Sequence, residues 1–283
     1  MSDIWLAPAK LNLFLHITGQ RPDGYHNLHT AFQFLDYSDE LTFTSRHDGI
    51  INLETPLKGV SDEDNLIIRA AKLLHSQANC NQQFGVNIRL KKVLPMGGGL
   101  GGGSSNAATS LLALNQLWQL NLASHELKRI GLELGADVPV FIHGEACIAK
   151  GIGEEFTPAY PEQNWYLVLV PTCHVNTSEI FSDSALTRDS KTLRIRAPLN
   201  WEVLGKLRND CESVVTKRYP EVKQALSWLS KYGVARMTGT GCCVFCSFPT
   251  EQEAKKVQNL LPLDLKGFVA RGVNQSPVKR SLS

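Results

Sequence analysis

The sequence contains no long apolar run, and this absence argues against a membrane-spanning helix. Its longest strongly apolar stretch covers residues 165–170, whereas a helix that crosses a bilayer needs about 20 apolar residues. Near the start of the chain, Asp3 and Lys10 interrupt the apolar residues and no basic segment precedes them, so a secretory signal peptide is not expected. We therefore predict a cytoplasmic protein with no membrane partner.

An excess of charge of one sign is also missing. The 283 residues include 29 Lys and Arg and 27 Asp and Glu, which gives a net charge of +2. Because no run of basic residues could follow a phosphate backbone, nucleic acid is not an expected partner. The hydrophobic fraction of 43% is ordinary for a globular protein and excludes a disordered chain. A chain of this length predicts two domains.

The seven cysteines are odd in number and irregularly spaced, which fits reduced thiols better than a disulfide framework. Cys243 and Cys246 have the C-x-x-C spacing of some metal sites. They lie, however, in a segment typical of a buried strand, on which residues three apart point to opposite faces. Since no second pair completes a zinc site, we predict a structural role for both thiols.

The apolar periodicity predicts mixed helices and strands in two parts of the chain. A boundary near residue 155 divides it into domains 1–155 and 156–283, and the last strand and tail could pack back on the first domain. Strands are predicted at residues 10–18, 31–35, 39–45, 50–53, 86–93, 140–143, 165–170, 244–248 and 267–273. Helices are predicted at residues 65–77, directly after residue 103, and at 124–134, 178–186, 202–208, 221–231 and 251–260.

A glycine-rich loop is the most informative passage, because six of the seven residues from 97 to 103 are glycine. Glycine lets the main chain approach a ligand and turn several N–H groups toward one point. Ser104 or Ser105 is expected to cap the helix that follows, so the amides and the helix dipole would together bind phosphate. A flexible linker is the alternative, but a linker would not lie between a strand and a helix.

Three known phosphate-binding loops fit poorly. A P-loop requires a lysine after its last glycine, whereas Gly103 is followed by Ser104. The dinucleotide fingerprint requires a second strand after the helix, and here another helix is predicted. Protein-kinase catalytic motifs are absent from the sequence. A nicotinamide-dependent oxidoreductase and a nucleotide-binding regulator without catalysis remain as alternatives from other classes.

Three segments resemble the motifs of the GHMP kinase superfamily, which includes galacto-, homoserine, mevalonate and phosphomevalonate kinases. They are Pro8-Ala-Lys-Leu-Asn-Leu13, the glycine loop of residues 95–105, and Thr238-Gly-Thr-Gly-Cys-Cys-Val-Phe245. The resemblance implies an α+β, two-domain GHMP kinase fold, with an N-terminal domain like domain 2 of ribosomal protein S5 and a ferredoxin-like C-terminal domain. Residues 10–26 and 134–141 are most similar to members that act on a cytidine-diphosphate-linked sugar alcohol. Another GHMP kinase, of the homoserine or mevalonate type, is the alternative within the family.

The resemblance also implies ATP and Mg²⁺ as cofactors, and it assigns roles to residues. Asp137 falls on the position of the catalytic base, and Lys10 would pair with it and keep it ionised. Taken alone, Asp137 would be a turn or cap residue and Lys10 an exposed lysine at a strand end. The ATP-binding residues implied are Pro95, Met96, Gly97, Gly98, Gly99, Leu100, Gly101, Gly102, Gly103, Ser104 and Ser105, together with Asn65 and Lys92 near the adenine.

The acceptor side of the site follows from the same resemblance. Tyr25 and Phe181 would sandwich a cytosine ring, and His26 would supply the hydrogen bonds that select it. Without the resemblance, a single aromatic residue is more often part of a core. The full set implied for the substrate is Asn12, Tyr25, His26, Thr177, Phe181, Thr238 and Gly239. The sequence identifies no metal ligands, and both a monomer and a homodimer are compatible with it.

Overall fold

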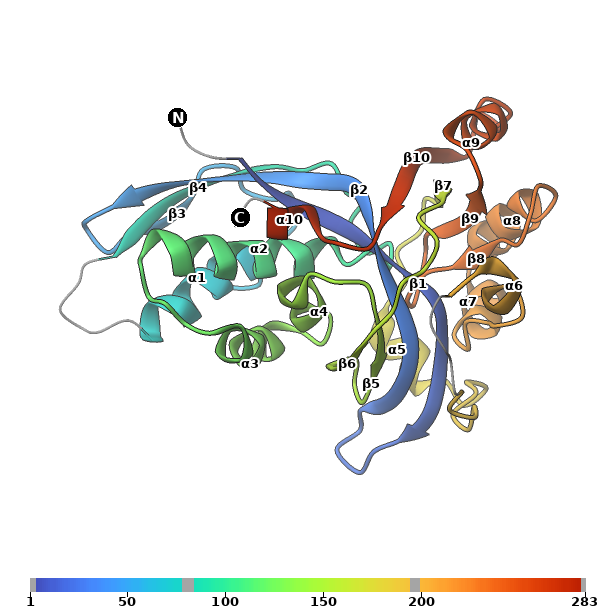
Figure 1. Cartoon of the computed structure of the whole chain (residues 1–283), viewed down its shortest axis with the longest axis horizontal. Coiled ribbons are helices and arrows are strands. Elements are labelled where there is room, and N and C mark those ends of the chain that lie inside the picture. The colour runs from blue at the N-terminus through green and yellow to red at the C-terminus, as the bar shows by residue number, and fades with distance from the viewer. Residues whose placement is uncertain (1–3, 78–83, 194–198, 281–283) are drawn as a thin grey trace.

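The computed structural model describes residues 4–77, 84–193 and 199–280. A long antiparallel hairpin of β1 (Ile4–Gln20) and β2 (His26–Arg46) runs through the molecule and joins its two halves (Figure 1). The strands predicted at 31–35 and 39–45 form one strand, which corrects the prediction. Ser38 and Asp39, at the polar interruption between them, still pair with β1 opposite Pro8 and Ala7, so the partner strand holds the ladder together.

A single ten-stranded sheet contains every strand that the structure describes, in the order β3-β4-β2-β10-β7-β9-β8, with β1 and β5 also paired to β2 and β6 paired to β5. The last strand, β10, pairs with β2 in the N-terminal part and with β7 in the C-terminal part, so it connects the two. The remaining strands are β3 (Ile51–Leu53), β4 (Gly85–Lys91), β5 (Cys147–Lys150), β6 (Glu155–Pro158), β7 (Trp165–Val170), β8 (Arg236–Met237), β9 (Val244–Phe248) and β10 (Lys266–Val273). The boundary near residue 155 stays a prediction.

Four helices lie on one side of the N-terminal strands (Figure 1). They are α1 (Leu66–Gln77), α2 (Gly102–Leu117), α3 (Ser124–Leu134) and α4 (Val138–His143). The strand predicted at 140–143 is therefore wrong. Pro139 in the first turn and Gly144 at the C-cap, with φ of 70°, favour a short helix there. The buried apolar faces of these helices pack on the sheet and form the N-terminal core.

The C-terminal part packs short helices around β7, β8 and β9. They are α5 (Thr177–Ser182), α6 (Trp201–Leu204), α7 (Glu212–Arg218), α8 (Pro220–Leu229) and α9 (Glu251–Gln258). The last helix, α10 (Pro277–Arg280), packs instead against β1, and its Val278 belongs to the N-terminal core. The sequence did not predict β8 or α7, and it predicted α5 and α6 as longer helices. Among the helices described, none has the length and apolar character needed to cross a membrane.

Two hydrophobic clusters meet along β9 and show how the buried thiols are placed. Cys246 belongs to the core of the C-terminal part, whereas Cys243 belongs to a third cluster with residues of β1 and β7. The two thiols thus point to opposite sides, as the strand geometry predicts. The third cluster lies under the middle of the hairpin and supports the polar residues of β1 described below.

Candidate active site

A cleft of about 660 Å³ lies where β1, the glycine loop, the α3–α4 turn and two C-terminal segments converge. Each of the three segments that resemble GHMP kinase motifs contributes to its lining, although they lie far apart in the sequence. From the implied site residues, the lining contains Lys10, Asn12, Lys92, Pro95, Met96, Gly97, Gly98, Gly99, Gly101, Gly102, Gly103, Ser104, Asp137, Thr177, Phe181 and Gly239.

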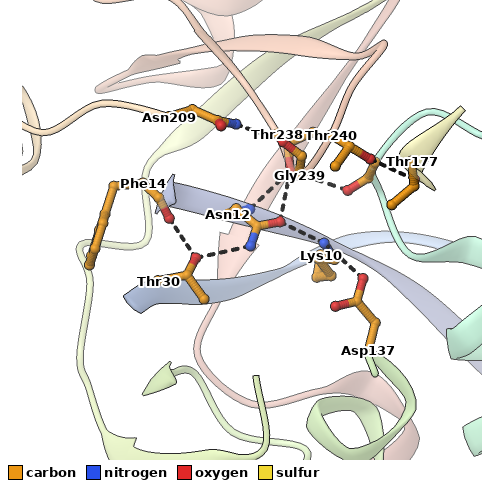
Figure 2. A network of polar contacts seen from close by, with 11 residues as sticks. Lys10, Asn12, Phe14, Thr30, Asp137, Thr177, Asn209, Thr238, Gly239 and Thr240 are labelled. Atoms are coloured by element: carbon orange, nitrogen blue, oxygen red, sulfur yellow. Dashed lines mark hydrogen bonds and ion pairs between the residues drawn. The ribbon is translucent and has the colours of Figure 1, made fainter. Parts of the chain in front are cut away.

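Lys10 is the central charge of the cleft. Its side chain is only 2% exposed, and its Nζ lies 3.1 Å from Oδ2 of Asp137 and donates a 2.6 Å hydrogen bond to Oδ1 of Asn12 (Figure 2). The ammonium also lies 5.3 Å from the centre of the Phe32 ring. A buried ammonium is tolerated only with such partners, because an unpaired buried charge is costly. The structure therefore brings together the two residues that only the resemblance had paired.

Asp137 ends the turn between α3 and α4. It occupies the N-cap position of α4, but its side chain makes no capping hydrogen bond. The carboxylate instead faces Lys10 and remains 39% exposed at the cleft. A carboxylate held by one ammonium and open to the cleft is placed to accept a proton from a bound hydroxyl group.

Hydrogen bonds on both sides fix the amide of Asn12. Its Nδ2 donates to Oγ1 of Thr30 at 2.9 Å, which leaves Oδ1 turned toward Lys10 (Figure 2). The hydroxyl group of Thr30 in turn donates a hydrogen bond to the carbonyl oxygen of Phe14. Irregularities in the β1–β2 register on either side of Lys10 and Asn12 aim this stretch of β1 at the cleft. Asn12 thus orients Lys10, and its contact with substrate stays a prediction.

The glycine loop has an alternating backbone. Gly97, Gly99 and Gly101 have positive φ values of 69°, 76° and 73°, whereas Gly98 and Leu100 do not. Such alternation turns successive N–H groups into one concavity, a known anion-binding arrangement. Gly101 is also the N-cap of α2, so the expected serine cap is wrong. Ser104 and Ser105 lie inside the first turn of the helix.

Both halves of the protein hold the loop in place. The N–H of Lys10 donates to the carbonyl oxygen of Leu100, and the N–H of Cys243 donates to that of Gly98, each at 3.0 Å. A Cβ atom on Gly99 would lie 2.2 Å from the carbonyl oxygen of Thr238, so only glycine allows this approach. The loop is a fixed wall of the cleft and not a linker.

Apart from Tyr25 and His26, which line a second hollow described below, four of the implied residues do not line the cleft. Leu100 and Ser105 are buried, and Oγ of Ser105 has no partner within the part of the chain that the structure describes. Asn65 is also buried and caps α1, accepting a 2.9 Å hydrogen bond from the N–H of Ile67. The hydroxyl group of Thr238 accepts a hydrogen bond from the N–H of Asn12 at 2.9 Å and donates one to the carbonyl oxygen of Gly99 (Figure 2). From this buried position it links β1 and the glycine loop to its own segment.

Lys92 lines the cleft, but its ammonium group is already bound by other residues of the protein. Its Nζ lies 2.7 Å from Oδ2 of Asp39 and donates to the carbonyl oxygen of Leu94. Asp39 is fully buried and also accepts from the N–H groups of Val93 and Leu94. This cluster fixes the strand-to-loop connection before the glycines.

A second hollow of about 470 Å³ continues the cleft past Phe181 and Thr177, which line both. Tyr25 and His26 line only the second hollow, so it brings together the implied base-binding residues. Tyr25 is 56% exposed. The His26 ring stacks on that of Phe181, with centres 5.0 Å apart and planes at 28°. Burial, and secondarily the charge of Arg188, lowers the pKa of His26, so the ring is neutral near pH 7.

Several residues that contribute to the site were missed from the sequence. Thr240 hydrogen-bonds Thr177 through their hydroxyl groups at 2.8 Å, and Asn209 donates to the carbonyl oxygens of Met237 and Gly239 (Figure 2). His174 lines the cleft beside Gly97, where an added Cβ would lie 2.5 Å from Nδ1. Thr240 lies in the motif-like segment of residues 238–245 but was not singled out there. No local sequence signal marks Asn209 or His174, because each acts on a segment distant in the chain.

The structure can also be compared with a dinucleotide-binding fold and with a metal site built from protein side chains. After the glycine loop, α2 is followed by α3 and not by a parallel strand, so the dinucleotide-binding arrangement is not present. Within the described residues, no group of three or more His, Cys, Asp or Glu side chains could hold a metal ion. A metal in this cleft would need ligands from a bound substrate.

Family models match both parts of the chain. The model described as "GHMP kinases N terminal domain" matches residues 65–145, and the one described as "GHMP kinases C terminal" matches residues 184–262. The chain is 55% identical over 98% of its length to the 4-diphosphocytidyl-2-C-methyl-D-erythritol kinase of Marinobacter nauticus, covering 96% of that protein. It is also 55% identical to the enzyme of the same name from Pseudomonas fluorescens, with 98% and 95% of the two chains covered.

Solved structures of kinases are also similar to this chain. A crystal structure of 4-(cytidine 5′-diphospho)-2C-methyl-D-erythritol kinase is similar with a TM-score of 0.82 and 30% identity, over 95% of this chain and 99% of that one. The mevalonate kinase of Methanococcus jannaschii is similar with a TM-score of 0.68 and 16% identity, over 97% and 99% of the chains. At that identity the second likeness concerns the fold only.

Proposed function

Because the chain belongs to the GHMP kinase family, we propose that it transfers the γ-phosphoryl group of ATP to the 2-hydroxyl group of 4-diphosphocytidyl-2-C-methyl-D-erythritol. The relatives that share about 55% of its residues over almost the whole chain carry the name of this kinase. The reaction belongs to the non-mevalonate route to isoprenoid precursors. The observation on which the proposal rests is the Lys10–Asp137 pair beside the glycine loop in one cleft.

Asp137 would accept the proton of the acceptor hydroxyl as its oxygen attacks the γ-phosphorus and ADP leaves. The support is a carboxylate that is free of capping bonds and open to the cleft. Lys10 would hold this carboxylate in place through their ion pair and stabilise the negative charge on the transferred group. Phosphoryl transfer depends mainly on positioning and charge stabilisation, and the bonds from Asn12 supply the positioning of Lys10.

The triphosphate would lie against the glycine loop, whose alternating φ values and helix N-terminus suit an anion. Gly97 to Gly103 and Ser104 would contact phosphate, and Lys92, Pro95 and Met96 would border the nucleoside. Mg²⁺, when bound, neutralises charge on the phosphate oxygens. We propose Ser104 as its protein ligand, because its hydroxyl oxygen lines the cleft and is of the kind that Mg²⁺ prefers.

The cytidine would occupy the second hollow. Tyr25 and Phe181 offer rings on which a flat base can stack, and His26 offers a polar edge. Thr177 and Gly239 line the main cleft and are suited to the acceptor or its phosphates. Asn65 and Thr238 would support the site from buried positions.

ADP release with three acceptors tests the proposal. With ATP and Mg²⁺ present, we expect turnover with 4-diphosphocytidyl-2-C-methyl-D-erythritol and none with homoserine or mevalonate. Phosphorus NMR of the product should locate the new phosphate on the 2-hydroxyl oxygen. Turnover with only homoserine or mevalonate would leave the chain a GHMP kinase but refute the assigned acceptor.

A further inference from the structure

Arg188 makes an unusual set of contacts behind the second hollow. Its guanidinium donates hydrogen bonds through three nitrogen atoms, and the acceptors are main-chain carbonyl oxygens and one imidazole nitrogen. One acceptor lies in the N-terminal part of the chain: Nε2 of His26, at 3.1 Å. The other three are the carbonyl oxygens of Phe181 at 2.8 Å, Asp183 at 2.9 Å and Leu186 at 3.1 Å. Arg188 thus ties the end of α5 to the first residue of β2.

The bond to His26 determines where the imidazole carries its proton. A guanidinium has only donors and stays protonated in proteins, so Nε2 of His26 must offer a lone pair to it. The remaining proton of the neutral ring then lies on Nδ1. Burial and the Arg188 charge both lower the pKa of His26, and this opposes protonation of the second nitrogen. The ring therefore has one defined donor, Nδ1–H.

The same guanidinium sets the ring of Phe181 against that of His26. It binds the carbonyl oxygen of Phe181 and the Nε2 atom of His26 at once, and the two rings stack with centres 5.0 Å apart. Both rings line the second hollow, whereas Arg188 is not part of its lining. Arg188 acts on that surface only through the other two residues.

A defined donor matters for the choice between pyrimidines. Cytosine carries acceptors at O2 and N3, whereas N3 of uracil carries a proton. Because both bases carry an acceptor at O2, the distinction lies at N3: an Nδ1–H group can donate to N3 of cytosine but meets the N3–H donor of uracil. A site that leaves polar groups unpaired rejects the wrong ligand. The other tautomer would present a lone pair at Nδ1 and lose this distinction.

We propose that Arg188 is the positioning residue for base selection: it holds the proton of His26 on Nδ1 and holds Phe181 against the same ring. This inference deepens the proposed function and depends on a cytidine nucleotide binding in the second hollow. It assigns no contact between Arg188 and the substrate.

The test compares full-length wild type with Arg188→Gln and, as a matched control, Arg218→Gln. Arg218 also binds α5 through Glu179 and Asp183, but no bond described joins it to His26. Long-range ¹H–¹⁵N spectra of histidine-labelled protein report the tautomer of His26. Titration calorimetry with cytidine 5′-diphosphate, uridine 5′-diphosphate and ATP reports binding.

We expect wild-type His26 to show the Nδ1–H tautomer and Arg188→Gln to show a mixture or the other tautomer. The affinity of Arg188→Gln for cytidine diphosphate should fall about 10- to 100-fold, the range expected when a buried hydrogen bond is lost. Its preference over uridine diphosphate should shrink, while ATP affinity stays that of wild type. Arg218→Gln should match wild type in the tautomer of His26 and in its affinity for each of the three nucleotides.

Three results would overturn the inference. They are an Nε2–H tautomer in wild type, an unchanged tautomer and cytidine preference in Arg188→Gln, or an equal loss of ATP and cytidine affinity that marks a general structural defect. If wild type shows the Nδ1–H tautomer but does not bind cytidine diphosphate, the proposed acceptor fails and base selection fails with it. The tautomer change in Arg188→Gln would still identify Arg188 as the residue that sets the proton of His26.

Discussion

The two ends of the cleft are built in different ways. The transfer end, formed by Lys10, Asn12, Asp137 and the glycine loop, consists largely of main chain and buried polar side chains held by the sheet. Lys10 and Asn12 are 2% and 3% exposed. The base end, formed by Tyr25, His26, Thr177 and Phe181, lies on a turn, the first residue of β2 and a short helix, and Tyr25 is 56% exposed.

This difference fits the roles proposed for the two ends. A proton acceptor and an ammonium must meet reacting atoms within a fraction of an ångström, and strands held on both sides provide that precision. Stacking on a base tolerates small displacements, because it depends on contact area more than on angle. Substitutions at the transfer end should therefore act on catalysis, and those at the base end on affinity.

The largest effect is expected for Asp137→Asn. The amide cannot accept the hydroxyl proton, and general-base catalysis contributes about 10²- to 10⁴-fold, so kcat should fall by that factor. ATP binding should persist, because the glycine loop is unchanged. Steady-state kinetics and ATP calorimetry measure both quantities. Asp264→Asn, whose carboxylate binds Gln224 outside the cleft lining, is the matched control. A kcat within threefold of wild type would remove Asp137 from the chemistry.

Gly101→Val should act on ATP binding and not on acceptor binding. At this position φ is 73°, and an added Cβ would lie 2.7 Å from Cζ of Phe141. Strain of this kind should weaken ATP binding about 100-fold. Gly59→Val is the control that separates a general effect of backbone strain from an effect on the loop. Gly59 also has a positive φ, of 80°, but nothing lies within 4 Å of the added atom. A folded Gly101→Val protein with wild-type ATP affinity would contradict our assignment of the loop.

The strand that carries the base end should be sensitive to acid. Burial lowers the pKa of His29 from 6.5 to about 4, and that of the facing His16 also falls. The unfolded chain therefore binds more protons, so the stability due to neutral His29 is complete above pH 6.5 and is lost as the pH falls toward 4. At pH 5 the loss should be about 2 kcal/mol.

Urea unfolding at pH 7 and pH 5 measures this loss. His29→Gln can still accept the bond from the N–H of Leu193 and should reduce the pH dependence. The exposed His47→Gln should not. An equally steep pH dependence in His29→Gln would show that other groups cause the acid lability.

The smallest effect is expected for Tyr25→Ala. Stacking on a base contributes about 1–3 kcal/mol, and the exposure of Tyr25 favours the lower end, so KM for the cytidine substrate should rise about tenfold. The kcat value and the KM for ATP should change little, and Tyr25→Phe should retain the stacking. A fall in kcat at unchanged KM would contradict the division between the two ends.

Much of the fold could be predicted because apolar periodicity reports burial directly. The strands at β7 and β9 and the helix α3 lie where the sequence places them. The errors occurred where tertiary contacts outweigh local preference. Across from β1, the polar residues near Ser38 stay in the ladder of β2, and the apolar residues after Pro139 form a helix under the sheet.

The site divides in the same way. The sequence located the glycine loop and predicts that it binds an anion, because so many glycines have no packing purpose. The residue that caps α2 could not be predicted, because the left-handed turn at Gly101 starts the helix there and leaves the serines inside it. Arg188 carried no signal in the sequence, because its importance comes from a bond to His26, 162 positions away.

By itself, the order of residues determined the glycine-rich loop between a strand and a helix, the placement of most strands and helices, and the opposite directions of the Cys243 and Cys246 thiols. These depend on local backbone freedom and on patterns of burial within a few residues. Only the tertiary structure decided that Lys10 meets Asp137, that Asn12 and Thr30 orient the ammonium, and that Arg188 reaches His26. Electrostatic and hydrogen-bond contacts act over a few ångströms, and the fold alone determines which distant residues come that close.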